Sequence, residues 1–434
     1  MVCRHQELRD AGRETAFTID AARLTFGRDC LEELGERAAA VGLRRVALFT
    51  DRTIHRLPHH ARAHESLRRA GLEVVTFDEV EIEPTDTSIA EAARFARDVQ
   101  PDGYVSLGGG SVIDTCKLAN LLAEHGGTLS RFVAAPWGDA LAVPGPLAPH
   151  LACPTTCGTG SEVTGIAVFD LLAHEVKTGV ASPWLRPSEA LVDPECTRTL
   201  PRQVVAASGM DVLSHALESF TARPFTARAA PARPTARPLS QGRNPWSDLG
   251  CAAALQILGR HLVDGVCEPE ADDAREQLAW AASLAGVAFG NAGVHGPHGM
   301  AYAVAGRVRD YHCAGYPAGA MVPHGIAVIV SAPAVFRHSA ATDPQRHLQA
   351  AAWLGADVRD AGPADAGELL SQRLVELMRA LSLPNGLGGI GYGADDVAAL
   401  ATATAPQARL LDNAPCPLDH ATLEQLFTAA LRYW

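Results

Sequence analysis

The sequence predicts two domains, an α/β domain over residues 1–195 followed by an all-helical domain over residues 196–434. The first half alternates short apolar runs with amphipathic stretches, which is the pattern of a mostly parallel sheet with helices on its faces. After residue 193 the apolar stretches are long, rich in alanine and spaced as in helices. A chain of 434 residues also exceeds the length at which a single hydrophobic core stops growing.

The expected strands of the first half are short apolar runs, separated by helical stretches around residues 60–70 and 88–99. We expect the runs at residues 46–50, 73–77 and 104–108 to form the parallel sheet. The runs at residues 151–154, 166–170 and 176–180 are expected to form a second sheet segment.

The helical half is expected to begin near LVDPECTRTLP, where Thr199 caps a helix that has Pro201 in its first turn. Residues 224–245, with the sequence PFTARAAPARPTARPLSQGRNP, contain too many prolines for regular helix. We expect them to form a long excursion within the helical domain.

Composition and charge exclude several classes of protein. A net charge of −12 repels phosphate backbones and the arginines are scattered, so we expect no nucleic-acid partner. The ten cysteines form no CxxC pair and are expected to be reduced thiols. The N-terminus shows no apolar core of a signal peptide, and the longest apolar run, residues 326–336, is too short to span a bilayer. These features predict a cytoplasmic protein with no membrane partner.

Two glycine-rich turns in the first half predict a dinucleotide site. The strand at residues 104–108 runs directly into GGGSVIDTCK, a turn whose backbone amides open onto the start of a helix, as phosphate binding requires. The segment TTCGTGSE at residues 155–162 follows another short strand and adds hydroxyl groups. An ordinary strand-to-helix turn is the alternative for the first segment, but two such turns at the carboxyl ends of strands define a crevice. The candidate cofactor contacts are Gly108, Gly109, Gly110, Ser111, Asp114, Thr155, Thr156, Thr159 and Ser161.

Asp51 ends the first expected strand and is the candidate that selects the dinucleotide. A carboxylate at this position accepts hydrogen bonds from a ribose 2′-hydroxyl and repels a 2′-phosphate, which favours NAD over NADP. The alternative is that Asp51 caps the turn in TDRTI.

Four side chains of the second half form a candidate metal site. Asp211 and His215 lie four residues apart in GMDVLSHALESF, so a helix places both on one face. His298 and His324 follow in two segments where each is succeeded by glycine. A hydrogen bond between Asp211 and His215 is the alternative, but one carboxylate with three imidazoles suits Fe(II) or Zn(II), between which spacing does not decide. Glu218 is either a second partner of a ligand or a solvated helix residue.

Further residues near these ligands are candidates for proton transfer. His295 precedes His298 by three residues in GVHGPHG and either lines the same cavity, relays a proton or is structural. Tyr302 follows in HGPHGMAY as another proton carrier. A metal together with a dinucleotide suggests redox chemistry on alcohols or ketones.

The segments GGGSVIDTCK, CPTTCGTGSEVTG and SGMDVLSHALESF, with the two His-Gly segments, resemble the iron-containing alcohol dehydrogenase family in order and spacing. The resemblance implies a Rossmann-like N-terminal domain, a helical C-terminal domain, and a metal in the cleft between them, an architecture shared with dehydroquinate synthase. It places Asp211, His215, His298 and His324 on the metal-ligand positions, with His298 also in the catalytic set. The glycine-serine turn, Thr155 and Thr156 fall on cofactor contacts, and Asp51 matches the residue that binds the adenosine ribose.

One difference from the common family motif indicates a particular branch of the family. Many family members carry HGMAH at the third ligand, whereas this chain has HGMAY, with Tyr302 at the last position. Together with the proline-rich excursion ending in QGRNP, this resembles the hydroxyacid-oxoacid transhydrogenase branch. The branch implies oxidation of 4-hydroxybutyrate to succinate semialdehyde, coupled through a bound NAD to reduction of 2-oxoglutarate to 2-hydroxyglutarate. An NAD-dependent alcohol dehydrogenase or aldehyde reductase that exchanges free cofactor is the alternative, and a non-catalytic nucleotide-binding protein is a more distant one.

Both implied substrates carry carboxylates, so a cation is expected in the substrate site. Arg237 in the excursion is the first candidate, with the excursion as a substrate lid, and Arg243, Arg307 and Arg309 are others. For each of them the alternative is a solvated surface arginine. A homodimer is expected by analogy with other oligomeric enzymes.

Overall fold

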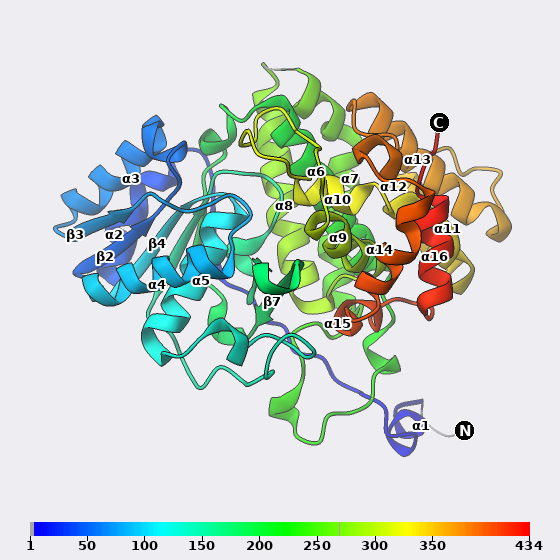
Figure 1. The fold of residues 1–434 in the computed structure, drawn as a ribbon, viewed down its shortest axis with the longest axis horizontal. Helices are drawn as coiled ribbons and strands as arrows, with labels where there is room; N and C mark the ends of the chain where they lie inside the picture. Colours follow the sequence, from blue (N-terminus) through cyan, green and yellow to red (C-terminus); the bar gives the residue numbers. More distant parts are fainter. Residues whose placement is uncertain (1–3, 269) are drawn as a thin grey trace. The chain divides into compact units, whose positions relative to one another are not determined.

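The computed structural model describes residues 4–268 and 270–434. It divides into an α/β unit, Ala21–Pro201, and a helical unit made of Met1–Asp20 and Arg202–Trp434, whose elements are labelled in Figure 1. The division therefore differs from the predicted boundary at residue 195, and residues 4–20 do not join the α/β unit. The physical reason is hydrogen bonding, because the Glu14 amide donates to the Arg228 carbonyl at 2.9 Å and the Asp20 amide donates to Asn291 Oδ1 at 2.9 Å.

A six-stranded sheet with parallel pairing throughout forms the centre of the α/β unit, in the order β1-β8-β5-β4-β2-β3. Its strands are β1 (Arg23–Phe26), β2 (Arg45–Phe49), β3 (Glu73–Phe77), β4 (Gly103–Gly108), β5 (His150–Pro154) and β8 (Glu189–Val192). The main helices of the unit are α2 (Leu34–Ala40), α3 (Pro58–Arg69), α4 (Asp86–Val99) and α5 (Gly110–His125). Gly108 pairs with Pro154, so β4 and β5 end side by side.

The predicted strands differ from this sheet in two respects. The run at residues 151–154 belongs to the parallel sheet as β5, and only β6 (Ile166–Leu171) and β7 (Val176–Ala181) form a second, antiparallel sheet. The two are joined by a short turn at Leu172–Glu175, which suits a hairpin and is too short for a parallel crossover. β1 and β8 were not predicted, since each has four residues and carries a charged side chain at its start.

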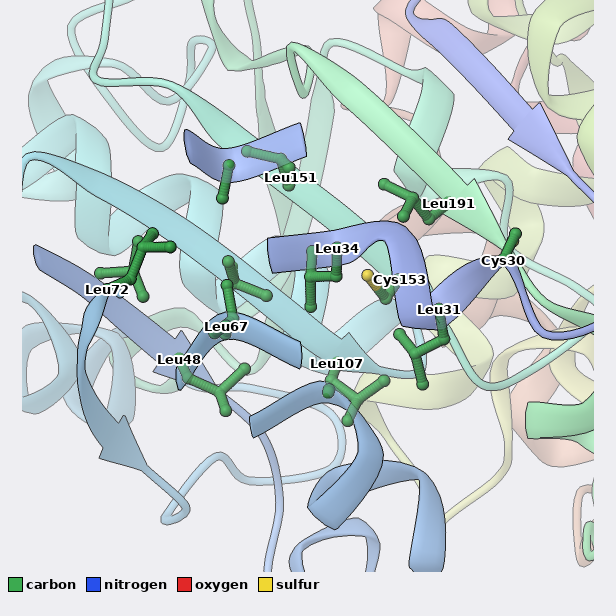
Figure 2. Close-up of a cluster of buried hydrophobic side chains, with 14 of the residues drawn as sticks. Cys30, Leu31, Leu34, Leu48, Leu67, Leu72, Leu107, Leu151, Cys153 and Leu191 are labelled. Carbon is green, nitrogen blue, oxygen red and sulfur yellow. The ribbon is translucent and has the colours of Figure 1, made fainter. Parts of the chain in front are cut away.

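Leucine and cysteine side chains fill the space between the sheet and the helices α2 and α3. Figure 2 shows Leu34 and Leu67 from the helices meeting Leu107 and Cys153 from the strands. The other face of the sheet packs separately around Phe49 and Tyr104. Every residue of β4 is buried, as expected for a central strand of a parallel sheet covered on both faces.

The helical unit is built around α6 (Arg202–Thr221), which begins directly after Pro201, so that this proline precedes the helix and does not lie in its first turn. Almost every residue of α6 is buried, which marks it as the central helix of the unit. The other helices are α1 (Arg4–Asp10), α7 (Pro245–Cys267), α8 (Asp272–Ala292), α9 (Gly296–Gly306), α10 (His324–Ile329), α11 (Ala332–Ser339), α12 (Pro344–Trp353), α13 (Ala366–Ala380), α14 (Val397–Thr404), α15 (Ala408–Leu411) and α16 (His420–Ala429).

The excursion at residues 224–245 contains only short 3-10 turns, at Phe225–Ala227 and Pro234–Ala236, before α7 begins. Nine cysteines, from Cys30 to Cys416, lie within the described residues and all are free. None of the helices in the described part of the chain combines the length and the hydropathy that crossing a bilayer requires.

Candidate functional site

Three helices of the helical unit bring the predicted metal ligands to one carboxylate oxygen. Asp211 and His215 lie on α6, His298 lies on α9, and His324 is the first residue of α10. The Nε2 atom of His298 lies 3.6 Å from Asp211 Oδ1, and the Nε2 atoms of His215 and His324 each lie 3.8 Å from it.

The glycine after His324 allows two helices of the site to pack closely. A Cβ atom on Gly325 would lie 2.0 Å from the Ala207 carbonyl oxygen of α6. Only glycine therefore lets α10 approach α6 closely enough to place His324 beside Asp211. The glycine therefore serves the packing of these two helices.

The four candidates are not equally placed. Ligand atoms of Asp211, His298 and His324 lie within 4.8 Å of one another. His215 lies at the side of this group, where its ring stacks on Phe289 at a centroid distance of 4.0 Å and on His298 at 4.7 Å. This stacking holds the ring of His215 in a fixed plane with Nε2 near the carboxylate.

The arrangement has the polar atoms that a cation requires. Asp211 Oδ1 and His298 Nε2 are buried and make no hydrogen bond. Leaving such atoms unsatisfied costs about 1–3 kcal/mol each, and a divalent cation between them removes that cost. One carboxylate and three imidazoles form a donor set that fits Fe(II) or Zn(II).

Glu218 is fully buried and holds His298 from the side opposite to Asp211. Its Oε1 accepts a hydrogen bond from His298 Nδ1 at 2.5 Å, and its Oε2 accepts from the backbone amide of His295 at 2.6 Å. A proton fixed on Nδ1 makes Nε2, which faces Asp211, the nitrogen that carries the lone pair once the ring is neutral. Of the two interpretations of Glu218, the structure supports the partner of a ligand and not the solvated helix residue.

The charges around His298 shift the pKa values of the group. Burial alone would lower the pKa of His298, but the neighbouring Glu218 and Asp211 carboxylates raise it to about 9. Burial would raise the pKa of Asp211, and the surrounding imidazoles, His215 first, instead hold it well below its usual range. The pKa of His215 falls to about 4 because burial disfavours its charged form. Two buried carboxylates, Asp211 and Glu218, therefore stay ionised beside the imidazoles, and they are the negative charges that a cation would balance.

The two predicted proton carriers lie in different surroundings. Tyr302 lies one turn after His298 on α9, with its ring centroid 6.3 Å from that of His324. His295 is fully buried, and its Nε2 lies 3.1 Å from Thr221 Oγ1. Burial lowers the pKa of His295 to about 4, so its ring is neutral and has no exposed atom through which to pass a proton to water. The structure favours the structural interpretation of His295 over the relay.

In the α/β unit, the two glycine-rich turns contact each other. Gly108 ends β4, Gly109 caps α5, and Gly110 begins that helix. A Cβ atom on Gly109 would lie 3.2 Å from Thr156 Cγ2, and one on Gly110 would lie 2.5 Å from Thr159 Cγ2. Glycine in the first turn therefore leaves space for the second, and both lie at the carboxyl ends of neighbouring strands.

The predicted hydroxyl contacts of these turns are used in different ways. Thr155 Oγ1 is buried and makes no hydrogen bond, so it is available to a ligand. Ser111 Oγ accepts from the Glu83 amide at 3.1 Å, and Thr159 Oγ1 accepts from the Ser161 amide at 3.3 Å. Asp114 is held by Ser161 and by the Val168 amide, which gives it a structural role within the unit.

Lys117 is a residue of this region that sequence reasoning missed. Its Nζ donates to Ser161 Oγ at 2.6 Å and to the Ile166 carbonyl at 2.7 Å, and it lies 3.5 Å from Asp114. Burial lowers the pKa of Lys117 to about 8. The signal was present after GGGSVIDTC, where a lysine directly precedes the mostly apolar run LANLLA.

Asp51 follows β2 and caps the turn there, which is the alternative to a ribose contact that the sequence left open. Its Oδ1 accepts from the Thr53 amide at 2.8 Å and from the Ile54 amide at 2.9 Å. It therefore caps the turn after β2. Any contact of Asp51 with a ribose has to be made in addition to this cap.

Arg237, the predicted substrate-binding arginine, is engaged with other residues of the helical unit in the structure. Its Nε donates to Glu14 Oε2 at 2.9 Å, and a second nitrogen donates to Thr18 Oγ1 at 3.1 Å. Through these bonds Arg237 connects the proline-rich excursion to the N-terminal segment. The excursion is therefore held in place and is not a free lid. Arg243 and Arg309 are paired with Asp343 and Asp396.

Comparison with known proteins identifies relatives of both units. The family model "Iron-containing alcohol dehydrogenase" matches residues 21–194, and "Fe-containing alcohol dehydrogenase family, C-terminal" matches residues 239–431. The chain is 41% identical over 433 residues to "Hydroxyacid-oxoacid transhydrogenase, mitochondrial" of Homo sapiens, with 98% of this chain and 92% of that protein covered. A probable enzyme of the same name from Dictyostelium discoideum is 42% identical over 428 residues, with 95% and 78% covered.

Solved structures agree with these relatives. A structure of 1,3-propanediol oxidoreductase has a TM-score of 0.84 and 27% identity, and covers 96% of this chain and 100% of its own. An alcohol dehydrogenase from Oenococcus oeni, with a TM-score of 0.83, 24% identity, and 96% and 100% covered, shows the same fold. The predicted fold class and the predicted family resemblance are confirmed.

The comparison corrects one prediction. The expectation of a cytoplasmic protein is wrong by this measure, because the names of the relatives from Xenopus tropicalis, Mus musculus and Homo sapiens place those proteins in mitochondria. The reduced thiols that supported the expectation distinguish reducing from oxidising surroundings. They do not separate one reducing compartment from another.

Proposed function

The chain belongs to the iron-containing alcohol dehydrogenase family, and from this premise we propose that it is a hydroxyacid-oxoacid transhydrogenase. The single observation that carries the proposal is 41% identity over 98% of the chain to an enzyme of that name. The proposed reaction oxidises 4-hydroxybutyrate to succinate semialdehyde and reduces 2-oxoglutarate to 2-hydroxyglutarate. The first acid loses a hydride and a hydroxyl proton and the second gains both, so the reaction needs no external oxidant.

We propose that Asp211, His215, His298 and His324 hold a divalent cation, with Fe(II) favoured by the family and Zn(II) as the alternative. The bound cation would supply Lewis acidity that polarises the substrate oxygen. The protein's own contribution is to fix the ligands. Glu218 sets the tautomer of His298, and the Phe289 ring fixes the plane of His215.

The glycine-rich turns are the proposed NAD site of the α/β unit. The supporting observations are the unpartnered Thr155 hydroxyl and the space that Gly109 and Gly110 leave beside the second turn. The nicotinamide would accept the hydride from one acid and return it to the other. Asp51 is the proposed reader of the ribose, and its acidic side chain favours NAD over NADP.

Two residues of α9 and its end are proposed to act on the substrate. Tyr302 is the proposed carrier of the hydroxyl proton, because it lies one turn after His298 and near His324. Arg307 follows α9 and is exposed, and it makes no hydrogen bond or ion pair with any described residue. It is therefore the remaining candidate, of the four arginines considered, to bind a substrate carboxylate.

Isotope transfer tests the proposal. The enzyme is dialysed free of loose cofactor and given 2-oxoglutarate with 4-hydroxybutyrate that carries deuterium on C4. We expect deuterium on C2 of 2-hydroxyglutarate by mass spectrometry without added NAD, and none in the Asp211→Asn variant. If turnover requires added NAD and the label appears in free NADH, the enzyme is an ordinary dehydrogenase that exchanges its cofactor, and the transhydrogenase proposal fails.

A further inference from the structure

The α/β unit contains a cavity of about 220 Å³ that the proposed reaction does not use. It lies at the amino-terminal ends of two neighbouring strands, because His150 is the first residue of β5 and Ser188 immediately precedes β8. The glycine-rich turns lie at the other, carboxyl ends of the sheet. The cavity is therefore distinct from the proposed NAD site.

The walls of the cavity combine an apolar surface with a few polar groups. The residues that line it are Lys117, Asn120, Pro146, Leu147, Ala148, His150, Pro183, Trp184, Leu185, Arg186 and Ser188. Among these described residues are two basic side chains, Lys117 and Arg186, and none is acidic. Burial lowers the pKa of His150 to about 3, so this imidazole is neutral and adds no charge.

Asn120 supplies the observation that indicates a ligand. It is 1% exposed, its Nδ2 donates to the Ala148 carbonyl at 2.9 Å, and its Oδ1 is buried without a hydrogen-bond partner. The bond to Ala148 fixes which end of the amide is the oxygen, because a carbonyl accepts only from the nitrogen. Oδ1 therefore needs a donor that the protein does not provide.

We propose that this cavity binds a small hydroxy acid as a second ligand site. The carboxylate is matched by the positive lining, in which Arg186 carries a planar guanidinium whose Nε donates to the Val163 carbonyl at 3.1 Å. The hydroxyl group donates to Asn120 Oδ1, and a short carbon chain packs on Trp184 and its apolar neighbours. The volume is below the 300–1,000 Å³ of typical drug-sized sites, which limits the ligand to a short acid.

Lys117 connects the cavity to the glycine-rich turns. It lines the cavity, while its Nζ holds Ser161 of the second turn at 2.6 Å. An anion in the cavity adds negative charge near this ammonium group and competes with Ser161 for it. Binding in the cavity is therefore expected to change the affinity of the α/β unit for NAD.

Calorimetry on the full-length protein tests the site with 2-hydroxybutyrate as the probe. The background is the Asp211→Asn variant, which lacks a proposed metal ligand and so weakens binding at the proposed active site. We expect binding of 2-hydroxybutyrate, with affinity about tenfold lower for butyrate, which lacks the hydroxyl donor, and lower again for 2-hydroxybutyramide, which lacks the charge.

Two variants locate the binding. Asn120→Leu in the same background is expected to weaken the hydroxy acid about tenfold and to leave butyrate unchanged. Trp184→Ala removes an exposed wall of the cavity and is expected to weaken both acids, whereas Trp246→Ala, an equally exposed tryptophan of the helical unit, changes neither. Thermal unfolding checks that each variant is folded.

The outcomes distinguish the cavity from the active site. Equal affinity of the hydroxy acid for Trp184→Ala and Trp246→Ala, or loss of all binding on Asp211→Asn alone, overturns the second site. Neither result bears on the isotope transfer between the two acids, so a failure of this inference is separate from a failure of the proposed function.

Discussion

Replacing Glu218 with glutamine tests how the helical unit prepares its metal ligand. The change keeps the size of the side chain and removes its charge and one acceptor oxygen. Glu218 Oε1 accepts from His298 Nδ1 at 2.5 Å, and Oε2 accepts from the backbone amides of His295 and His298 at 2.6 and 3.4 Å. All three partners are donors, so the NH₂ group of glutamine finds an acceptor only if His298 moves its proton from Nδ1 to Nε2.

The magnitude follows from the tautomer of His298. If the amide nitrogen faces Nδ1, the imidazole accepts there and carries its proton on Nε2, where no lone pair remains for a cation. If it faces the backbone, two buried donors oppose each other at a cost of about 1–3 kcal/mol. Loss of such a supporting carboxylate typically lowers metal affinity about 10–100-fold, or about 1.4–2.7 kcal/mol. We expect a decrease in this range.

The assay is a titration of the metal-free protein with Zn(II) or, without oxygen, Fe(II), in competition with a chelator of known affinity. Glu14→Gln is the matched control, since Glu14 is another buried acid of the helical unit that pairs with Arg237 and touches none of the four candidate ligands. The control is expected to lose stability and to keep its metal affinity. If Glu218→Gln binds the metal within twofold of the parent protein, the proposed role of Glu218 is wrong.

Three further predictions follow from the same structure. Arg237→Ala leaves the KM for both acids unchanged and lowers the free energy of unfolding by about 1–3 kcal/mol. Arg307→Ala raises the KM for the acids about tenfold or more. Steady-state kinetics in which Arg237→Ala raises KM and Arg307→Ala does not would contradict the roles proposed for both arginines. Gly110→Ala places a methyl group 2.5 Å from a side-chain carbon of the second turn and weakens NAD binding about tenfold or more, measured by fluorescence titration, while Gly145→Ala, where a Cβ meets open space, does not. Because the pKa of His298 is raised to about 9, a proton occupies its ligand nitrogen at neutral pH and must leave before a metal binds. Metal affinity should therefore rise about tenfold per pH unit toward pH 9 and then level off. A metal affinity that stays flat between pH 6 and 9 would refute this prediction.

The parts of the fold that the sequence predicted are those governed by local periodicity. β2, β3 and β4 are buried runs with clear helical stretches between them, and α6 has the regular spacing of a buried helix. The placement of β5 depended on which strands pair, which is a long-range property. The N-terminal segment was assigned to the wrong unit for the same reason, because its partners Arg228 and Asn291 lie more than 200 residues away.

In the candidate site, too, the locally determined features were predictable and the long-range contacts were not. The spacing of Asp211 and His215 follows from one helical turn, and the motif of His324 and glycine marked the ligand although not the packing reason for the glycine. The ion pair between Arg237 and Glu14 was not predictable, because no local sequence pattern around an arginine in a proline-rich segment indicates which distant acid it will contact. Buried networks around Lys117 likewise depend on residues brought together only by the fold.

The central claim is that one cation is shared by side chains of three helices in the helical unit. Anomalous X-ray scattering from crystals of the metal-loaded protein, recorded on both sides of the metal's absorption edge, tests it directly. We expect one peak about 2.0–2.2 Å from Asp211 and from the Nε2 atoms of His215, His298 and His324. A peak bound elsewhere, or no peak at these side chains in protein that contains stoichiometric metal, would contradict the account.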